Sequence, residues 1–359
     1  MGEKKGPSDL TLDQLGDAPR DQLGRRIRDV RLSVTDRCNF RCGYCMPAEV
    51  FGPDFAFLPR AELLTFEEIA VVARELVALG ARTLRITGGE PLVRRDLERL
   101  VGLLRALDAS EALGGEPLDI ALTTNGSLLA KLASTLRAAG LNRITVSLDS
   151  LNPETFTRMS GSALPLESVL EGIAAAAEVG FTKIKLNAVI RRGVNDMEIP
   201  ALVEFARASG HTLRMIEYMD VGTTNGWRLD EVLPASEIVA RIHALHPIEP
   251  IAPSRPGEVA RRYRYLDGGG EIGLIASVSA PFCGDCTRAR VSADGHLYTC
   301  LFATEGSDLK RYLRPIVDAE GLREGLRARW TARDDRYSEL RDAETASRLP
   351  KVEMFRVGG

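Results

Sequence analysis

The sequence predicts an α/β fold, a partial, TIM-like (β/α)6 barrel followed by a small C-terminal domain. Between about residues 28 and 219, six short β-like runs alternate with amphipathic helical stretches. Strands that alternate with helices usually pair in parallel through crossover connections. From about residue 235 the alternation stops, and one helical pattern is followed by further β-like runs. The predicted organisation is a flexible tail over 1–24, the barrel over 25–230 and the C-terminal domain over 231–359.

Each element is predicted from its local pattern, in chain order. Residues 1–24 are rich in Gly, Asp and Pro and have weak periodicity, which indicates a flexible tail. The predicted strands span 29–36, 83–88, 119–125, 142–149, 183–190 and 212–219. The helices between them span 66–79, 94–107, 127–138, 166–179 and 197–208. In the C-terminal domain one helix begins near 235, and β-like runs span 261–266 and 271–278.

Composition narrows the class of protein. The chain has 359 residues, a formal net charge of −3 and 44% hydrophobic residues, which suits a globular protein of about two domains. This charge argues against general binding to nucleic acid or to a membrane surface. The polar start lacks a secretory signal, and no apolar run approaches the roughly 18 residues of a membrane span. We therefore expect a cytoplasmic protein, in which reduced cysteines bind metal or act in catalysis.

The predicted strands alternate polar and apolar side chains with period two. Strands of a parallel sheet covered by helices are usually apolar on both faces. If the apolar faces meet the helices, the polar faces line the interior of the barrel, and Arg31, Arg85 and Lys185 point into it. Unpaired cations are costly to bury, so these residues predict a polar cavity that binds an anion. The alternative is that they pair with Asp149 and other carboxylates.

Three cysteines follow the first predicted strand. Cys38, Cys42 and Cys45 have the spacing C-x3-C-x2-C. Three clustered thiolates without a fourth suit a four-iron cluster with one iron open to a ligand. A structural zinc site, the alternative, needs four protein ligands, and all four histidines are distant in sequence.

A second triplet, Cys283, Cys286 and Cys300, lies near the other end of the chain. It again offers three ligands, and the alternative is a zinc ribbon with His296 as the fourth. Between these cysteines, Arg288 and Arg290 flank Ala289, so in a strand their side chains project from the same face. Arginine forks suit phosphate and planar polar groups, although a solvated edge strand gives the same pattern.

The first triplet, with Tyr44 before its last cysteine, resembles the signature of radical S-adenosylmethionine (SAM) enzymes. Gly88-Gly89-Glu90-Pro91 resembles the stretch that binds the SAM amino group in those enzymes. Over about residues 28–359, the ordered set of motifs resembles the GTP 3′,8-cyclase family of molybdenum cofactor biosynthesis. These motifs are SVTDRCNFRCGYC, RITGGEPLVRRD, TTNG, SLDS, KLNAVI, LRMIEYM, GEIGLI, FCGDCTRARVSADGHLYTCLF and the final Gly358-Gly359.

The resemblance implies two [4Fe-4S] clusters, one on Cys38, Cys42 and Cys45 and one on Cys283, Cys286 and Cys300. It implies that the second cluster binds the guanine base of GTP. The positions that match SAM contacts are Tyr44, Gly89, Ser147, Arg214 and Met219. The positions that match GTP contacts are Arg31, Arg85, Thr123, Lys185, Arg288, Ala289 and Arg290.

The resemblance also implies the reaction, which makes the chain a radical SAM lyase. A 5′-deoxyadenosyl radical from SAM removes hydrogen from the ribose C3′ of GTP, and the carbon radical attacks C8 of guanine. Arg288 or Arg290 is expected to assist the final reduction and protonation, and Gly358-Gly359 to enter the active site. Implied partners are a low-potential electron donor, a second copy in a homodimer and the downstream cyclic pyranopterin monophosphate synthase.

Two other functions compete with this prediction. A radical SAM peptide-modifying enzyme with an auxiliary cluster also carries cysteines after its barrel, although usually more than three. A zinc-stabilised nucleotide-binding module would use the same cysteines without catalysis. The basic residues predicted inside the barrel favour a nucleotide substrate over a peptide.

Overall fold

The computed structural model describes residues 18–109, 115, 117–182, 184–341 and 351–358. Its centre is a curved sheet in which six parallel strands follow one another in sequence order. These strands are β1 (Asp29–Ser33), β2 (Thr83–Thr87), β3 (Asp119–Thr124), β4 (Arg143–Ser147), β5 (Lys185–Ile190) and β6 (Thr212–Glu217). The predicted six-unit partial barrel is confirmed. Each strand is shorter than predicted by one to three residues.

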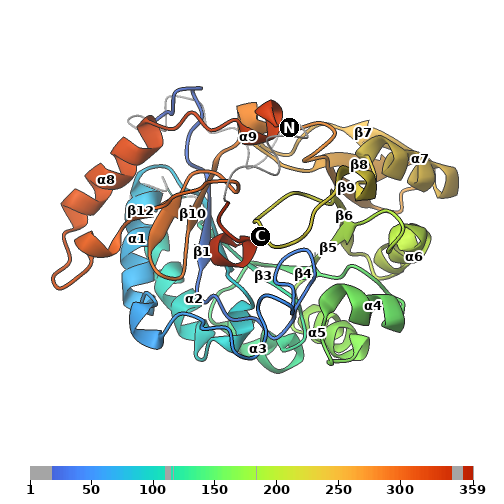
Figure 1. Cartoon of the computed structure of the whole chain (residues 1–359), viewed down its shortest axis with the longest axis horizontal. Helices are drawn as coiled ribbons and strands as arrows, with labels where there is room; N and C mark the ends of the chain where they lie inside the picture. Colours follow the sequence, from blue (N-terminus) through green and yellow to red (C-terminus); the bar gives the residue numbers. More distant parts are fainter. Residues whose placement is uncertain (1–17, 110–114, 116, 183, 342–350, 359) are drawn as a thin grey trace, which may run out of the picture.

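Helices cover the outside of this sheet (Figure 1). They are α1 (Phe66–Ala78), α2 (Leu97–Arg105), α3 (Leu129–Ala138), α4 (Pro153–Ser160), α5 (Leu166–Glu178) and α6 (Ile199–Ala208). Between helices and sheet lies the core, where side chains such as Val30, Leu32 and Ile86 are at most 1% exposed. The apolar strand faces therefore meet the helices, as the alternation predicts, and the polar faces line the interior.

Helix α4 was not predicted, although its start carries a local signal. Asn152 caps it, because its side-chain oxygen accepts a hydrogen bond from the backbone N–H of Thr155 at 3.0 Å. Pro153 occupies the first helical turn, where its missing N–H costs nothing. Capping also fixes the start of α1, where Thr65 and Glu68 form a reciprocal capping box.

The C-terminal part of the chain extends the barrel sheet at both edges. Its helices are α7 (Ala235–Leu245), α8 (Ala319–Thr331), α9 (Tyr337–Leu340) and α11 (Met354–Val357). Its strands are β7 (Ile248–Ile251), β8 (Arg261–Tyr265), β9 (Glu271–Ile275), β10 (Arg288–Val291), β11 (His296–Tyr298) and β12 (Ser307–Asp308). Strand β9 pairs in parallel with β6, and β10 pairs in parallel with β1. The second cysteine triplet is thereby brought beside the first strand of the barrel.

Two terminal segments lie close to this sheet. Within residues 18–24, which the sequence assigns to a flexible tail, Pro19 and Asp21 are buried and Asp21 is 6% exposed, whereas residues 20 and 22–24 are exposed. At the other end of the chain, α11 lies inside the arc of strands (Figure 1), where it contacts β1. Residues 1–17 of the predicted tail and Gly359 lie outside the described residues.

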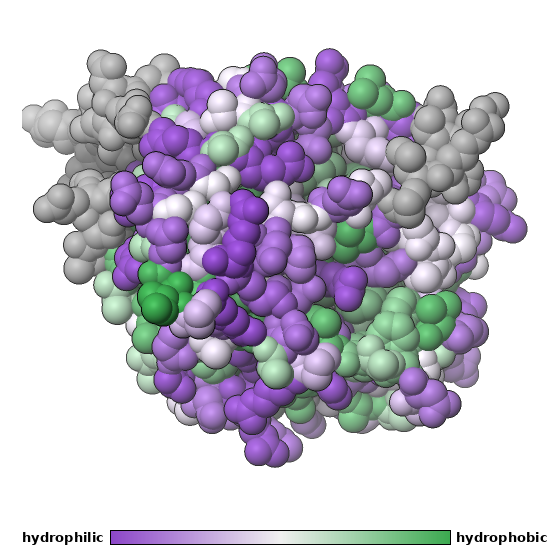
Figure 2. Space-filling model, turned by 60° about the vertical axis from the view of Figure 1, so that its left-hand side comes forward, coloured by the Kyte–Doolittle hydropathy of each residue, from purple (hydrophilic) through white to green (hydrophobic). Residues whose placement is uncertain are grey.

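The face of the molecule shown in Figure 2 is mainly hydrophilic, with hydrophobic patches separated by polar side chains. Within the described residues, no helix has the length and apolar character needed to cross a membrane.

Candidate active site

Three arginines lie side by side on adjacent strands inside the barrel. The strand register pairs Arg31 on β1 with Arg85 on β2 and with Arg290 on β10. Arg85 donates hydrogen bonds through Nη1 to the hydroxyls of Thr123 at 3.0 Å and Thr145 at 3.2 Å. Because like charges in one row repel each other, this arrangement favours an anion between them.

Arg31, Arg85, Thr123 and Thr145 line an interior cavity of about 420 Å³, which we call the basic chamber, whereas Arg290 is not part of its walls. Its walls carry nine arginine and lysine residues and only three carboxylates. All three carboxylates are already engaged: Asp119 pairs with Arg143, Asp29 with Arg255, and Glu258 with Arg214 at 4.0 Å. The cations that line the chamber are Arg28, Arg31, Arg82, Arg85, Arg143, Lys185, Arg214, Arg255 and Arg288. The chamber therefore has the size and charge of a site for a polyanionic ligand.

Burial makes these charges costly in the ligand-free protein. It lowers the pKa of Arg31 well below its usual value, and the charges of Arg290, Arg85 and Arg288 lower it further. Burial and the charges of Arg214, Arg143 and Arg85 lower the pKa of Lys185 to about 7. An anion in the chamber would favour the charged forms and offset this cost.

The first cysteine triplet lines a second cavity, of about 170 Å³, which we call the first cysteine cavity. Four of the positions expected to contact SAM line it with the cysteines: Tyr44, Gly89, Ser147 and Met219. A Cβ on Gly88 or Gly89 would come within 2.4 Å of the carbonyl oxygens of Thr35 or Arg37. Glycine at these positions therefore lets the loop after β2 approach the loop that carries the cysteines.

Two buried carboxylates support the walls of the first cysteine cavity. The hydroxyl of Tyr44 donates to Asp149 at 2.7 Å, and the N–H of Val189 donates to the other oxygen at 2.8 Å. Glu90 accepts from the N–H of Leu92 at 2.9 Å, and from Thr124 and Asn125. Burial raises the pKa of Asp149 to about 6 and that of Glu90 to about 7. Neither was assigned a site role from sequence, although the polar alternation that includes Ser147 also includes Asp149.

The second triplet lines a third cavity, of about 110 Å³, which we call the second cysteine cavity. Cys283 begins a 3-10 turn (Cys283–Asp285), and Arg288 donates through Nη2 to the sulfur of Cys286 at 3.4 Å. His296, the alternative fourth ligand of a zinc ribbon, does not line this cavity and lies 3.3 Å from the carboxylate of Asp294. The local geometry thus gives no support to the zinc ribbon.

The two triplets differ in their electrostatic surroundings. Burial raises the pKa of all three thiols in the first triplet, that of Cys38 to about 12. Burial acts in the same direction on Cys286, but the charges of Arg288 and Arg333 outweigh it and lower the pKa of that thiol to about 6. Burial raises the pKa of Cys300 to about 11, so in the second site it is Cys286 that favours the thiolate before any metal binds, whereas the first site needs the metal to replace the protons.

The three cavities share walls. Asn187 on β5 lines all of them, and its buried Oδ1 has no hydrogen-bond partner. Arg31 and Arg288 line both the basic chamber and the second cysteine cavity, and Thr123 lines both the chamber and the first cysteine cavity. A ligand in the basic chamber would therefore adjoin the walls of both cysteine cavities.

Two residues lie apart from their expected contacts. Arg214, expected to contact SAM, lines the basic chamber and not the first cysteine cavity, and its nearest carboxylate is Glu258 at 4.0 Å. Ala289, expected to contact GTP, is fully buried in β10 and lines none of the three cavities. The side chain of Ala289 alternates with those of Arg288 and Arg290, so it faces the other side of the sheet.

The donor sets fit iron–sulfur clusters by their chemistry. Each triplet consists of free, half-buried cysteines on the wall of one cavity, and three thiolates without a fourth suit a four-iron cluster. In the described part of the chain, no three His, Cys, Asp or Glu side chains converge on a site for a single metal ion.

Comparison with known proteins identifies the class. Residues 32–206 match the radical SAM superfamily, and residues 211–339 match the family described as Molybdenum Cofactor Synthesis C. The structure of Streptococcus suis SuiB bound to S-adenosylmethionine has a similar fold, with a TM-score of 0.58 and 14% identity, over 84% of this chain and 68% of that one. The fold and the site define a radical SAM protein, and the superfamily supports SAM and an iron–sulfur cluster as cofactors.

Curated relatives narrow the class to a family. A protein of Acidothermus cellulolyticus named GTP 3′,8-cyclase is 54% identical, over 95% of this chain and 99% of its own length. Proteins with the same name from Xanthomonas axonopodis pv. citri and Staphylococcus aureus are 51% and 47% identical, each over 95% of this chain and 98% of their own length. The chain belongs to the GTP 3′,8-cyclase family.

Proposed function

We propose that this chain is a GTP 3′,8-cyclase, a radical SAM lyase that acts early in molybdenum cofactor biosynthesis. The observation that carries the proposal is the position of the basic chamber, which shares walls with both cysteine cavities. A nucleoside triphosphate matches this interior, because its phosphates need cations and its base and ribose would extend towards the cysteines.

Cys38, Cys42 and Cys45 would hold the first [4Fe-4S] cluster, with SAM on its open iron. When bound, this pair supplies a 5′-deoxyadenosyl radical by one-electron cleavage of SAM. Tyr44, Gly89, Ser147 and Met219 would orient SAM, because all four line the first cysteine cavity. Asp149 fixes Tyr44 through its hydroxyl and thereby positions the cysteine loop.

Arg31, Arg85 and Lys185 would bind the triphosphate, with Thr123 holding Arg85 in place. Arg214 lies among these cations, so we assign it to the triphosphate rather than to SAM. Charge-assisted hydrogen bonds of this kind fix orientation as well as affinity. Their function is to hold the ribose C3′ towards the first cysteine cavity and to keep the reacting carbon away from water.

Loss of hydrogen from C3′ leaves a substrate radical, whose C3′ forms a bond to C8 of guanine. One electron and one proton then complete 3′,8-cyclo-7,8-dihydro-GTP. Arg288 and Arg290 line the second cysteine cavity, and we assign them to this last step. Cys283, Cys286 and Cys300 would hold a second [4Fe-4S] cluster, whose open iron would bind the guanine base.

Gly358 occupies the interior, where its carbonyl oxygen accepts from Arg31 at 2.9 Å and also from Arg290. We therefore assign the C-terminal Gly358-Gly359 segment to the active site, although Gly359 itself lies outside the described residues. Our expectations also include a cytoplasmic location, a homodimer, a low-potential electron donor and transfer of product to cyclic pyranopterin monophosphate synthase. The division into 25–230 and 231–359 is likewise retained as a proposal.

The test is anaerobic formation of 5′-deoxyadenosine by reconstituted protein with SAM and reductant, with and without GTP. GTP-dependent formation, together with a cyclised product of GTP detected by mass spectrometry, is the expected result. Formation that is indifferent to GTP would redirect the search towards peptide substrates. No formation despite a full iron content would contradict the proposed function.

A further inference from the structure

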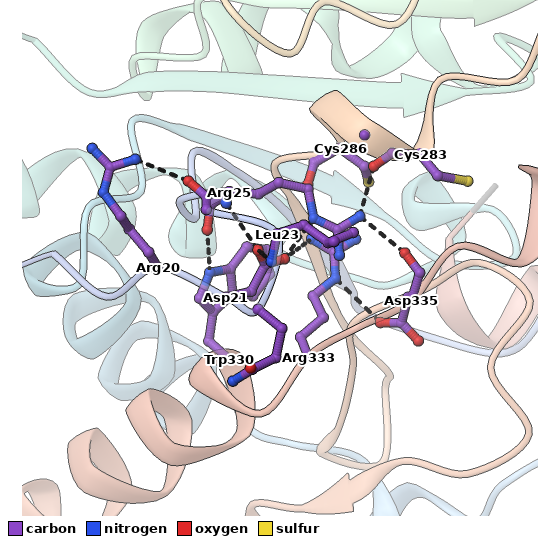
Figure 3. A network of polar contacts seen from close by, with 12 residues as sticks. Arg20, Asp21, Leu23, Arg25, Cys283, Cys286, Trp330, Arg333 and Asp335 are labelled. Atoms are coloured by element: carbon purple, nitrogen blue, oxygen red, sulfur yellow. Dashed lines mark hydrogen bonds and ion pairs between the residues drawn. The ribbon is translucent and has the colours of Figure 1, made fainter.

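Two buried arginines hold the loop that carries the second cysteine pair. Arg25 donates through Nη1 to the carbonyl oxygen of Cys283 at 2.6 Å. Arg333 donates through Nη1 to the carbonyl oxygen of Cys286 at 2.7 Å. Figure 3 shows the two guanidinium groups converging on this loop from opposite ends of the chain. Their contacts fall on two of the three cysteines expected to bind metal at this site.

The two arginines are fixed by a shared set of partners. The carboxylate of Asp21, fully buried, accepts from Arg25 Nε at 2.6 Å and lies 3.4 Å from Arg333 Nη1. Arg333 donates from Nε to Asp335 at 3.1 Å, and its guanidinium lies 4.6 Å from the centre of the Trp330 ring. The indole N–H of Trp330 in turn donates to the carbonyl of Arg25 at 3.0 Å (Figure 3).

A role in stability alone does not explain where these charges lie. A buried ion pair is often no more stabilising than an apolar replacement of the same volume, so its position needs a further reason. Arg25 and Arg333 are 5% and 2% exposed, and both direct Nη1 at the backbone of a cysteine. Positive charge and N–H donors close to cysteine sulfurs raise the potential of an iron–sulfur site, because they stabilise its more negative, reduced form.

We infer that Arg25 and Arg333 are positioning residues of the second cysteine site. They hold Cys283 and Cys286 at the spacing that the metal site needs and keep two positive charges behind it. This inference rests on the proposed second cluster. It assigns a function to residues 20–26, because Asp21 and Arg25 place the N-terminal segment against the cysteine loop. It also explains why α8 ends beside that loop, where Arg333 follows it.

The experiment compares full-length Arg25→Gln, Arg333→Gln and Arg333→Lys with the wild type after anaerobic reconstitution. Iron and sulfide per chain, the electron paramagnetic resonance spectrum and the midpoint potential of the second cluster are measured. The reference for a missing second cluster is the triple variant Cys283→Ala, Cys286→Ala, Cys300→Ala. The matched control is Arg105→Gln, because Arg105 also donates to two backbone carbonyls, those of Leu118 and Gly140, far from both triplets.

We expect Arg25→Gln and Arg333→Gln either to lose iron down to the level of the triple variant or to retain the cluster at a lower midpoint potential. Arg333→Lys keeps the charge, so its potential should return towards that of the wild type. Arg105→Gln should match the wild type in iron content and potential, whatever its effect on thermal stability. If the glutamine variants do not fold, Arg333→Lys tests the positioning role alone, because lysine keeps the charge but lacks the guanidinium that contacts Cys286 and Asp335 together. A lowered iron content in Arg333→Lys then supports the inference, and a wild-type iron content overturns it.

Two results separate the failure of this inference from that of the proposed function. If the wild type contains no more iron than the triple variant, the proposed second cluster is wrong. If the wild type contains more, but the Arg25 and Arg333 variants match it in iron content and midpoint potential, the positioning role is overturned.

Discussion

The carbonyl oxygen of Gly358 accepts a hydrogen bond from Nη1 of Arg31, with a distance of 2.9 Å between the two atoms. Arg31 lies on the first strand of the barrel, and Gly358 lies at the end of the last helix, 327 positions later. Arg290, the neighbour of Arg31 in the strand register, also donates to the carbonyl of Val357 at 3.1 Å. The C-terminal segment thus accepts hydrogen bonds from two of the cations that we assign to the substrate. A displacement of this segment would therefore change the surroundings of both cations.

The substitution Gly358→Ala should displace this segment. Gly358 has a φ of +69°, and an added Cβ would lie 2.2 Å from Cγ2 of Thr87. We expect a loss of roughly 100-fold in the rate of GTP-dependent 5′-deoxyadenosine formation, because small displacements of positioning groups have effects of that size. Gly210→Ala is the control, since Gly210 has the same φ of +69° with no atom within 4 Å of the added Cβ. Equal rates in the two variants would contradict a role for the C-terminal segment.

Binding of GTP should take up a proton at Lys185. Its pKa of about 7, lowered by burial and by Arg214, Arg143 and Arg85, leaves it mostly neutral at about pH 8. A bound triphosphate favours the ammonium form, so binding without reductant should take up close to one proton and weaken as pH rises above 7. Calorimetric titration in buffers of different ionisation enthalpy measures this uptake.

The variant Lys185→Met should take up no proton and bind GTP about 10- to 100-fold more weakly, the effect of losing one charge-assisted hydrogen bond. Lys131→Met, at an exposed position of α3, is the control. The same pKa also determines whether the stability of the folded protein rises or falls with pH. The unfolded chain binds more protons at Lys185 than the folded one, so the wild type should gain stability between about pH 7 and 10, and Lys185→Met should lack this gain. Proton uptake unchanged in Lys185→Met would rule out this residue as the source.

The interior charges could be predicted because strand alternation is a local property. Arg31, Arg85 and Lys185 each occupy the polar face of a strand that can be read from five or six residues, and the structure places all three on one chamber. Pairing between distant strands has no such signal. Nothing in the sequence of β10 indicates that Arg290 lies beside Arg31, because that register depends on how the whole chain closes.

Contacts made by irregular segments could not be predicted from the sequence either. Asp21 and Arg25 lie where the composition indicates a flexible tail or its border, and besides each other they contact residues more than 250 positions away. Arg255 and Glu258 line the chamber from a loop between β7 and β8 that has no periodicity to interpret. Arg214, which the resemblance matches to a SAM contact, lines the basic chamber, whereas Ile216 on the same strand lines the first cysteine cavity.

The substitution Arg288→Ala removes a side chain that contacts both the basic chamber and the second cysteine triplet. Arg288 lines both cavities, contacts the sulfur of Cys286 at 3.4 Å and lies 5.2 Å from the centre of the Phe282 ring. We expect the product of GTP to fall about 10- to 100-fold, as for loss of a charge-assisted contact. In iron-free protein the pKa of Cys286 should rise from about 6, seen as a shift of the pH profile of alkylation.

For Arg288→Ala, the control is Arg264→Ala, which removes an exposed arginine paired with Glu249 on β7. It should leave both the product yield and the alkylation profile unchanged. An Arg288→Ala protein that converts GTP at the full rate would remove the proposed role of Arg288 in the reaction.

Asp220, just after β6, anchors the C-terminal segment to the barrel. Its carboxylate accepts from Lys351 at 2.8 Å and from Tyr337 at 2.7 Å, and also pairs with Arg341. Burial opposes its ionisation, but the hydrogen bonds from Lys351 and Tyr337 and the charge of Arg341 outweigh burial and hold its pKa below the usual value. The side chains of Asp220 and Lys351 are 3% and 1% exposed. This network therefore lies in the interior and not on the surface.

Asp220→Asn should destabilise the protein by about 3–5 kcal/mol, the range for breaking a buried ion pair by removal of one partner. Because the folded pKa of Asp220 is depressed, the difference from the wild type should be complete above about pH 4 and should shrink as pH falls through the folded pKa. Hydrogen exchange of residues 351–358 should accelerate, since the anchor of that segment is lost. Asp267→Asn, which breaks an exposed pair with Arg207, should change stability by no more than about 1 kcal/mol. If exchange of residues 351–358 is the same in Asp220→Asn as in the wild type, the segment is held by its other contacts, such as those with Arg31, Arg290 and Thr223, and Asp220 is not its anchor.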